Sequence, residues 1–194
     1  MRRDILNIVN FVEKGSSVLD LGCGDGELLS LLITKKNCKG KGIEINEKKI
    51  LKCIEKGLTV YHGDMDEILS CYQNRSYDYI ILSLTLHQVK NPEKIIDESV
   101  RIGKKVIISF PNFANWRIRF NLLFKGTLPT YDSCAYEWYS ENYVHFITIK
   151  EFERFCKKKG LKILKKKFLP ETFFWINPNF IAHSAIYCLE SYLF

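Results

Sequence analysis

The chain has 194 residues, of which 46% are hydrophobic and 26% charged, and this composition is typical of a single globular domain with a sizeable core. Its net charge of +7 is compatible with an anionic partner. The basic runs, Lys157–Lys159 and Lys165–Lys167, are short, however, and the first closes a predicted helix, where cations suit the helix dipole. A lysine-rich solvated surface is therefore favoured over nucleic-acid binding.

The cysteines and the hydropathy pattern predict a cytoplasmic protein. The seven cysteines form no C-x-x-C pair and are odd in number, which argues against a structural zinc site and against a disulfide framework. No apolar run approaches the ~18 residues of a membrane span, and Met1–Asp4 leads into an amphipathic segment rather than an apolar signal core. We therefore expect reduced thiols, no metal site and no membrane segment.

Helices and strands are predicted to alternate along the first 110 residues. Apolar side chains at helical spacing predict a helix from Ile5 to Val12, which Gly15 stops. Apolar runs predict strands at residues 17–21, 41–45, 58–61, 77–84 and 106–110. Helices are expected between them: one around residues 28–32, one capped by Asn46, a short one at residues 68–69, and one that starts at Asn91-Pro92 and ends at Gly103.

The second half of the chain adds one helix and two strands. Thr148 and Glu151 have the spacing of a capping box and predict a helix that Gly160 ends, with strands at 161–168 and 182–189. The elements together predict a Rossmann-like α/β fold over residues 1–194, with a mostly parallel seven-stranded sheet and helices on both faces. Residues 111–147 interrupt the alternation. They are rich in aromatic side chains and too long for a simple connection, so we expect a partly helical lid over the strand ends or a docking surface.

A glycine-rich loop, Gly22-x-Gly24-x-Gly26, follows the first strand, where ligands of such sheets bind. A dinucleotide fingerprint, G-x-G-x-x-G, would need glycine where Glu27 stands. Asp25 and Glu27 would also repel a pyrophosphate. S-adenosylmethionine (SAM) carries no phosphate, and its ammonium and sulfonium groups are cationic. The acidic loop therefore favours SAM over a dinucleotide.

Three further carboxylates and a serine stand where a SAM site needs them. Glu44 ends the second strand, 18 residues after Gly26, where a carboxylate can accept from both ribose hydroxyls. Asp64, after the third strand, can accept from the adenine amino group, Asp20 can orient the ammonium end, and Ser83 is expected to line the pocket by its backbone. Each carboxylate singly has the alternative of being an exposed turn residue, but their register after successive strands favours a common site.

Two resemblances follow from these residues. Asp20–Gly26, Glu44 and Asp64 resemble the successive SAM-binding motifs of class I methyltransferases. The wider match resembles the MetW family of methionine biosynthesis proteins, and it rests on Ser109–Arg117, Tyr136–Tyr139, His145 with Thr148-Ile149, Gly42–Ile45, Cys53-Ile54, Gly57-Leu58 and Arg101–Gly103. Cys134-Ala135 departs from the Leu-Pro that the family tends to have, which puts the approach to the lid in doubt.

The MetW resemblance implies SAM or S-adenosylhomocysteine (SAH) as ligand and a homoserine O-acyltransferase of the MetX type as partner. Two roles stay open: a SAM- or SAH-sensing subunit that acts on that partner, and an active methyltransferase of a small metabolite. The methyl acceptor is not implied. Ser83–Gln88 lacks the Asn/Asp-Pro-Pro-aromatic motif, which argues against methylation of base amines. His87, Tyr136 and His145 are weak catalytic candidates, and for His87 a structural hydrogen bond is favoured over a role as general base.

Overall fold

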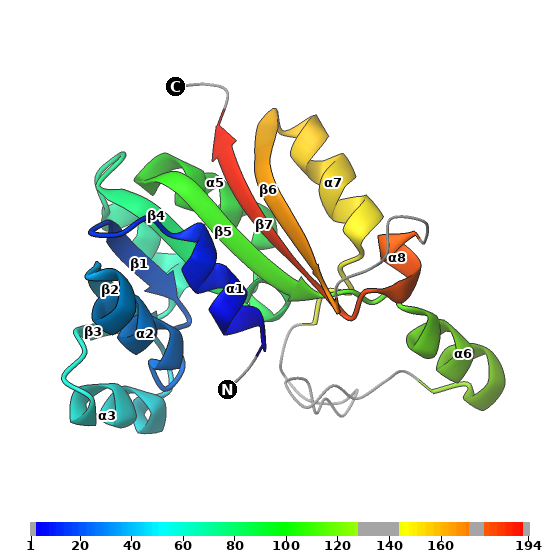
Figure 1. Ribbon diagram of the computed structural model, residues 1–194, viewed down its shortest axis with the longest axis horizontal. Helices are drawn as coiled ribbons and strands as arrows, with labels where there is room; N and C mark the ends of the chain where they lie inside the picture. The colour runs from blue at the N-terminus through cyan, green and yellow to red at the C-terminus, as the bar shows by residue number, and fades with distance from the viewer. Residues whose placement is uncertain (1–2, 128–143, 171–176, 192–194) are drawn as a thin grey trace.

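The computed structural model describes residues 3–127, 144–170 and 177–191, and Figure 1 shows their arrangement. The strands are β1 (Ser17–Leu21), β2 (Lys39–Glu44), β3 (Val60–His62), β4 (Tyr77–Ser83), β5 (Gly103–Pro111), β6 (Leu161–Leu169) and β7 (Ser184–Ser191). The helices are α1 (Arg3–Phe11), α2 (Glu27–Lys36), α3 (Glu47–Glu55), α4 (Met65–Ile68), α5 (Pro92–Ile102), α6 (Trp116–Lys125), α7 (Ile149–Lys158) and α8 (Pro178–Ile181), with 3-10 turns η1 (Leu69–Cys71) and η2 (Leu86–Gln88).

The described strands form one sheet in the order β3-β2-β1-β4-β5-β7-β6. Strands β1 to β5 pair in parallel, whereas β7 runs antiparallel to both β5 and β6. From β1 the chain builds outward to β2 and β3 and then returns to β4 on the other side of β1. The strand order therefore reverses between β1 and β4, and ligands of such sheets bind at the carboxyl ends beside this reversal.

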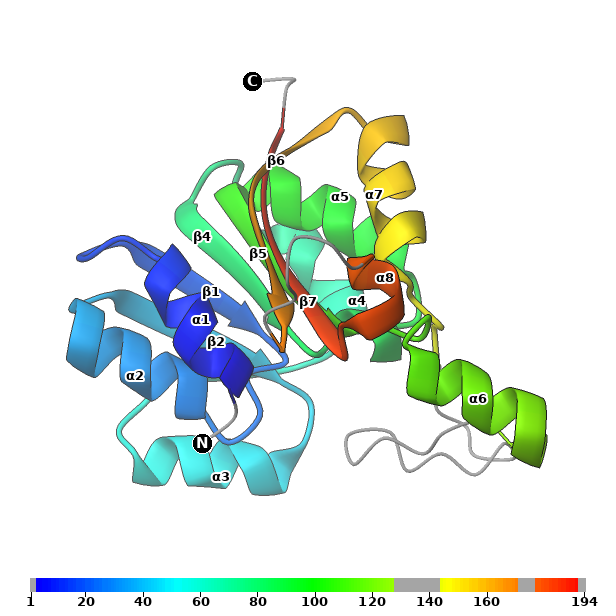
Figure 2. The same cartoon turned by 45° about the vertical axis from the view of Figure 1, so that its right-hand side comes forward.

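Alternate side chains of each strand enter separate cores on the two faces of the sheet. Val18 and Ile81 pack with the buried side chains of α1 and α2. Leu19 and Ile80 point to the opposite face, which α5 and α7 cover. Figures 1 and 2 show these two helical layers on either side of the sheet. Burial on both faces explains why the central strands are continuous apolar runs rather than alternating ones.

The expected fold class is confirmed, and most element boundaries differ by only one to three residues from those expected. The strand at 17–21 is β1 as predicted, and Asn46 caps α3 by accepting from the Lys49 amide. The capping box is also present: Thr148 accepts from the Glu151 amide at 3.2 Å. Among the strands, β5 differs most and begins three residues early, whereas the starts of β2, β3 and β7 differ by two residues; the short helix α4 also begins three residues early, and α2 extends to Lys36. The extended start of β5 pairs with β4, since Gly103 and Lys105 lie opposite Tyr77 and Tyr79. The Lys104 and Lys105 side chains pair there with Asp78 and Glu13.

The two edges of the sheet are unequal. Strand β3 at one edge has three residues, whereas β6 at the other has nine, and the β6–β7 register shifts between Ile163 and Lys165. Strand β6 carries four lysines, Lys162 and the consecutive Lys165, Lys166 and Lys167. Among the described residues, no helix is both long enough and apolar enough to cross a membrane.

Candidate functional site

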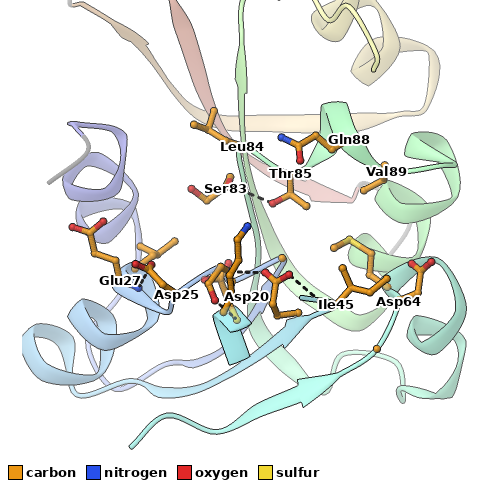
Figure 3. Close-up of a pocket in the computed structure, with 18 of the residues that line it drawn as sticks. Asp20, Asp25, Glu27, Ile45, Asp64, Ser83, Leu84, Thr85, Gln88 and Val89 are labelled. Carbon is orange, nitrogen blue, oxygen red and sulfur yellow. Dashed lines mark hydrogen bonds between the residues drawn. The ribbon is translucent and has the colours of Figure 1, made fainter. Parts of the chain in front are cut away.

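A cavity of about 660 Å³ opens at the carboxyl ends of β1, β2 and β4. Its size lies within the range of small-molecule sites. The cavity is lined by the loop after β1, by the residues that follow β2, β3 and β4, and by helix residues, namely Ile5 of α1, Glu27 and Leu28 of α2 and Lys49 of α3. In Figure 3, Asp20, Asp25, Glu27 and Asp64 lie along one side of this space, and Ser83, Leu84, Thr85, Gln88 and Val89 lie along the other.

The loop after β1 is held in place by backbone contacts. The amides of Gly22 and Cys23 both donate to the Ile43 carbonyl of β2, at 2.8 and 3.1 Å. Gly22, Gly24 and Gly26 all have positive φ, between 61° and 77°. A Cβ on Gly26 would collide with Leu58, whereas a Cβ on Gly24 would meet nothing within 4 Å. The surface of Gly24 that lines the cavity is therefore open to a ligand.

Glu44 is the residue that ties this loop to β2. It is only 6% exposed, and its carboxylate accepts three backbone hydrogen bonds. Oε2 accepts from the Gly24 amide at 2.8 Å, and Oε1 accepts from the amides of Ile45 and Asn46 at 3.0 and 2.9 Å. A carboxylate offers about four lone-pair positions. One position therefore remains, on Oε2, and a second ligand contact requires release of one of these amides.

The other predicted carboxylates lie in the same cavity. Asp20 is 1% exposed and lies beside Gly42 of β2 and Ile81 of β4 in the sheet register. Asp64 caps α4 by accepting from the Asp66 amide at 2.9 Å. Asp66, which the prediction left out, accepts from the amides of Lys90 and Asn91 at 3.2 Å each. These bonds join the loop after β3 to the segment that precedes α5.

The wall opposite the glycine-rich loop begins with Ser83 at the end of β4. Leu84 follows in the left-handed region with a φ of 54°, which costs an L-residue roughly 1–2 kcal/mol. Its amide lies 3.1 Å from the Ser109 carbonyl and 3.0 Å from Ser109 Oγ, so contacts to β5 hold this conformation. The turn brings Thr85 over Gly22, where an added Cβ would lie 2.7 Å from Thr85 Cγ2. Thr85 and Gly22 thus close the bottom of the cavity.

The lining carries opposite charge to the chain as a whole. Among the described residues, six carboxylates and two lysines, Lys49 and Lys90, line the cavity, although the net charge of the chain is +7. Asp25 is partly compensated by Lys56, whose Nζ lies 3.9 Å from Oδ2, but both side chains are exposed, so this pair contributes little. The cavity therefore attracts cationic ligands and disfavours phosphates.

Of the three catalytic candidates, His87 and His145 are described by the structure, and neither lines this cavity. His87 is fully buried, and burial, with a smaller effect of His145, lowers its pKa to about 4. Its Nε2 lies 3.1 Å from Gln88 Nε2, and an amide nitrogen only donates, so this ring nitrogen accepts. The His145 amide donates to the His87 carbonyl at 2.9 Å, and its Nε2 lies 2.9 Å from the Val89 carbonyl. Tyr136 lies outside the described residues.

Residues that sequence reasoning did not select also line the cavity: Ile5, Cys23, Leu28, Ile45, Lys49, Gly63, Met65, Thr85, Gln88 and Val89. Cys23, Ile45, Gly63, Met65 and Thr85 lie within two residues of predicted site residues, so their closeness in the chain could have indicated them. Ile5 of α1 and Lys49 of α3 reach the cavity through the packing of those helices, for which local pattern carries no signal. The described part of the 111–147 segment supplies no lining residue. Its helix α6 extends away from the sheet beside α8 (Figures 1 and 2).

Comparison with known proteins finds relatives in two groups. The bifunctional methionine biosynthesis protein MetXA/MetW of Rhodopirellula baltica is 31% identical over 154 residues, which cover 75% of this chain and 25% of that protein. The chain thus matches a quarter of that relative's length. The demethylmenaquinone methyltransferase of Bacillus mycoides is 26% identical over 193 residues, which cover 89% of this chain and 79% of that enzyme.

Solved structures show the fold class. A SAM dependent methyltransferase from Archaeoglobus fulgidus superposes with a TM-score of 0.69 at 16% identity, covering 97% of this chain and 91% of that one. A putative S-adenosylmethionine dependent methyltransferase from Listeria monocytogenes gives 0.69 at 13% identity, covering 96% and 97%. The chain therefore has the Rossmann-like fold of class I methyltransferases.

The family comparison covers almost the whole chain. The family described as "Methionine biosynthesis protein MetW" matches residues 2–189, which include all of β1 to β6 and the cavity residues. The chain belongs to the MetW family of methionine biosynthesis proteins.

Proposed function

We propose that this chain binds SAM or SAH in the cavity and serves methionine biosynthesis by acting on a homoserine O-acyltransferase of the MetX type. The observation that carries the ligand part is the acidic cavity at the strand reversal, with Glu44 fixed beside a glycine-rich loop. Carboxylates offset the positive charges of the ammonium and sulfonium groups of SAM, whereas they would repel the negative charge of a phosphate. Membership of the MetW family supports the pathway.

The arrangement of the lining assigns parts of the ligand to particular residues. Oε2 of Glu44 has a lone pair left for a ribose hydroxyl, and a contact to the second hydroxyl takes the place of one backbone amide. Ile45 and Met65 offer apolar surface for the adenine next to Asp64. Gly24 and Asp20 remain for the amino-acid end. When bound, SAM would supply a methyl group on a sulfonium, and the residues around it hold and desolvate it.

The proposal that the partner is a homoserine O-acyltransferase rests on a relative in which MetXA and MetW are joined in one polypeptide. The Rhodopirellula baltica protein is named for both MetXA and MetW, and the matched region makes up 25% of its length. Two activities joined in one polypeptide are held at high effective concentration, which favours their physical association. A separate MetW-type chain would reach the same arrangement by docking on its acyltransferase.

A second candidate is methyl transfer to a small acceptor. It is favoured by the demethylmenaquinone methyltransferases, which match nearly the whole chain at 21–26% identity. Methyl transfer needs mainly proximity and a dry site. The cavity wall formed by Ser83, Thr85 and Gln88 carries no charged side chain that could act as a general base, and this is compatible with methyl transfer.

Calorimetric titration with SAM and SAH tests the ligand part directly. Saturable binding that Glu44→Gln weakens supports the proposal, and a folded wild-type protein that binds neither ligand overturns it. Incubation with purified homoserine O-acyltransferase, homoserine and an acyl thioester donor, with and without SAM or SAH, then separates the two roles. A change in the acyltransferase rate that depends on SAM or SAH supports the sensor. Release of SAH in amounts that exceed the protein supports the methyltransferase.

A further inference from the structure

Helix α6 carries an apolar stripe that the described structure leaves uncovered. The stripe consists of Trp116, Phe120, Leu123 and Phe124, which are 39%, 47%, 75% and 73% exposed. At 100° per residue these four side chains span about one quarter of the helix circumference. Ile118, on the opposite face, is 8% exposed and is the buried residue of α6, whereas Leu122 on that side is 50% exposed.

The aromatic rings of the stripe contact one another along the helix. The Trp116 and Phe120 rings meet edge to face with centroids 5.9 Å apart, and the Phe120 and Phe124 rings stack at 5.5 Å. Contacts of this kind restrict the rotamers before any partner binds, so less conformational entropy is lost on docking. Anchors at positions i, i+4, i+7 and i+8 are the pattern by which a helix enters an apolar groove.

Basic side chains flank the stripe. Arg117 lies on one side of it and Arg119 on the other, Lys125 ends the helix, and α6 contains no Asp or Glu. The Arg117 guanidinium lies 5.5 Å from the Trp116 ring centroid. Arg119 Nε donates to the Ala114 carbonyl at 2.7 Å, which fixes that side chain beside the stripe. A complementary surface is therefore an apolar groove with an acidic rim.

The base of α6 is anchored, and no residue of this helix lines the cavity. Asn115 is fully buried; its side chain donates to the carbonyls of Ile181 and Ala182 at 2.6 and 3.1 Å and accepts from the Arg117 amide at 2.9 Å. Figures 1 and 2 show α6 extending from the end of β5 on the side of α7 and α8, away from α2 and α3. A partner seated on the stripe would leave the cavity open to its ligand.

We propose that the α6 stripe is the surface by which this chain docks on its homoserine O-acyltransferase, in an apolar groove with an acidic rim on that enzyme. The inference rests on the partner part of the proposed function. The fused relative argues for this occupant, because a chain that works as part of one polypeptide with the acyltransferase needs a surface against it. The arginines that flank the stripe argue for the acidic rim.

The test compares two double variants for binding to the purified homoserine O-acyltransferase of the same organism. Phe120→Asp/Phe124→Asp alters the stripe, and Leu51→Asp/Ile54→Asp alters two equally exposed apolar residues of α3 as matched control. We expect the stripe variant to bind at least ~30-fold more weakly, as for the loss of interface hot spots, and the control to bind like wild type. Titration with SAM checks that both variants keep the fold and the cavity.

Four outcomes would overturn the surface assignment. Two of them are acyltransferase binding by the stripe variant within threefold of wild type, and equal loss in both variants. The third is a wild-type dimer in sedimentation velocity that only the stripe variant dissociates, since a second copy would then be the occupant. The fourth is co-sedimentation with phosphatidylglycerol vesicles that the stripe variant alone loses. A wild type that titrates SAM but never binds acyltransferase would instead refute the partner part of the proposed function.

Discussion

Replacement of Glu44 by Gln separates ligand recognition from loop stability. The amide oxygen of Gln can keep the two bonds from Ile45 and Asn46, which leaves its NH2 group facing the Gly24 amide 2.8 Å from the former Oε2. Two donors then face each other, and the lone pair of Oε2 that is left for a ribose hydroxyl is gone. The variant therefore loses both a loop bond and a ligand contact.

The structure sets the expected magnitudes. A hydrogen bond to a charged acceptor contributes about 1.5–3 kcal/mol, so loss of one ribose contact weakens SAM and SAH roughly 10- to 150-fold, and loss of two weakens them more. Loss of the Gly24 bond lowers the free energy of unfolding by a similar amount. For a chain of this size, about 2 kcal/mol corresponds to roughly 4–8 °C in Tm.

Asp78→Asn is the matched control. Asp78 also accepts from a backbone amide, that of Ser17 at 2.9 Å, and pairs with Lys104, but it stands at the opposite end of β4 from the cavity. We expect a comparable loss of Tm in calorimetry and no change in the dissociation constant of SAM. If folded Glu44→Gln binds SAM within threefold of wild type, the assignment of the cavity is wrong.

Three further predictions concern charge, the loop and pH. Raising NaCl from 0.05 to 0.5 M should weaken SAM binding several-fold and SAH binding less, because SAH lacks the sulfonium charge that the six lining carboxylates attract. Gly24→Ala should cost about 1 kcal/mol of stability but weaken SAM strongly, because Gly24 lines the cavity and a Cβ there meets open space that the ligand would share; Gly26→Ala should cost about 2 kcal/mol more, because its Cβ collides with Leu58. Between pH 7 and 4.5 the wild type should lose about 2 kcal/mol more unfolding free energy than His87→Gln, because the pKa of His87 is lowered to about 4 and the unfolded chain takes up the proton first.

Each of these has a measurement that can contradict it. Titration calorimetry at both salt concentrations would contradict the first if SAM and SAH respond alike. Urea unfolding of the two alanine variants would contradict the second if Gly24→Ala were the less stable. For the third, urea unfolding at the two pH values would contradict the buried neutral state of His87 if wild type and His87→Gln lost stability in parallel.

Local patterns predicted most of the helices and strands, and they selected carboxylates that line the cavity. Strand β1 and the caps at Asn46 and Thr148 depend on neighbouring residues, so periodicity and capping rules found them. Glu44 and Asp64 could be selected because the ends of consecutive parallel strands meet at one edge of the sheet. The same reasoning could not reveal that three backbone amides already occupy the Glu44 carboxylate, since that depends on how the Gly24 loop folds back on β2.

The opposite wall and the end of the sheet depend on contacts distant in sequence. Leu84 has a left-handed backbone conformation, but no glycine stands there to indicate it in the sequence. A hydrogen bond to Ser109, 25 residues further on, holds this conformation. Both late strands were expected, but their sequences do not encode that β7 inserts antiparallel between β5 and β6. The outward direction of α6 likewise escaped prediction, because apolar residues on both faces of a helix do not say which face packs inward.

The lysines of β6 contribute to the excess positive charge of the chain, and at this edge of the sheet they can oppose aggregation without binding any ligand. A nine-residue strand at the edge of a sheet presents unpaired backbone groups, on which a second molecule can add a strand and begin to aggregate. Lys162, Lys165, Lys166 and Lys167 would face the same lysines of an incoming copy, and the register shift at Ile163/Lys165 makes the edge irregular. Like charges brought this close repel, so the edge stays solvated at the concentrations at which newly made chains meet.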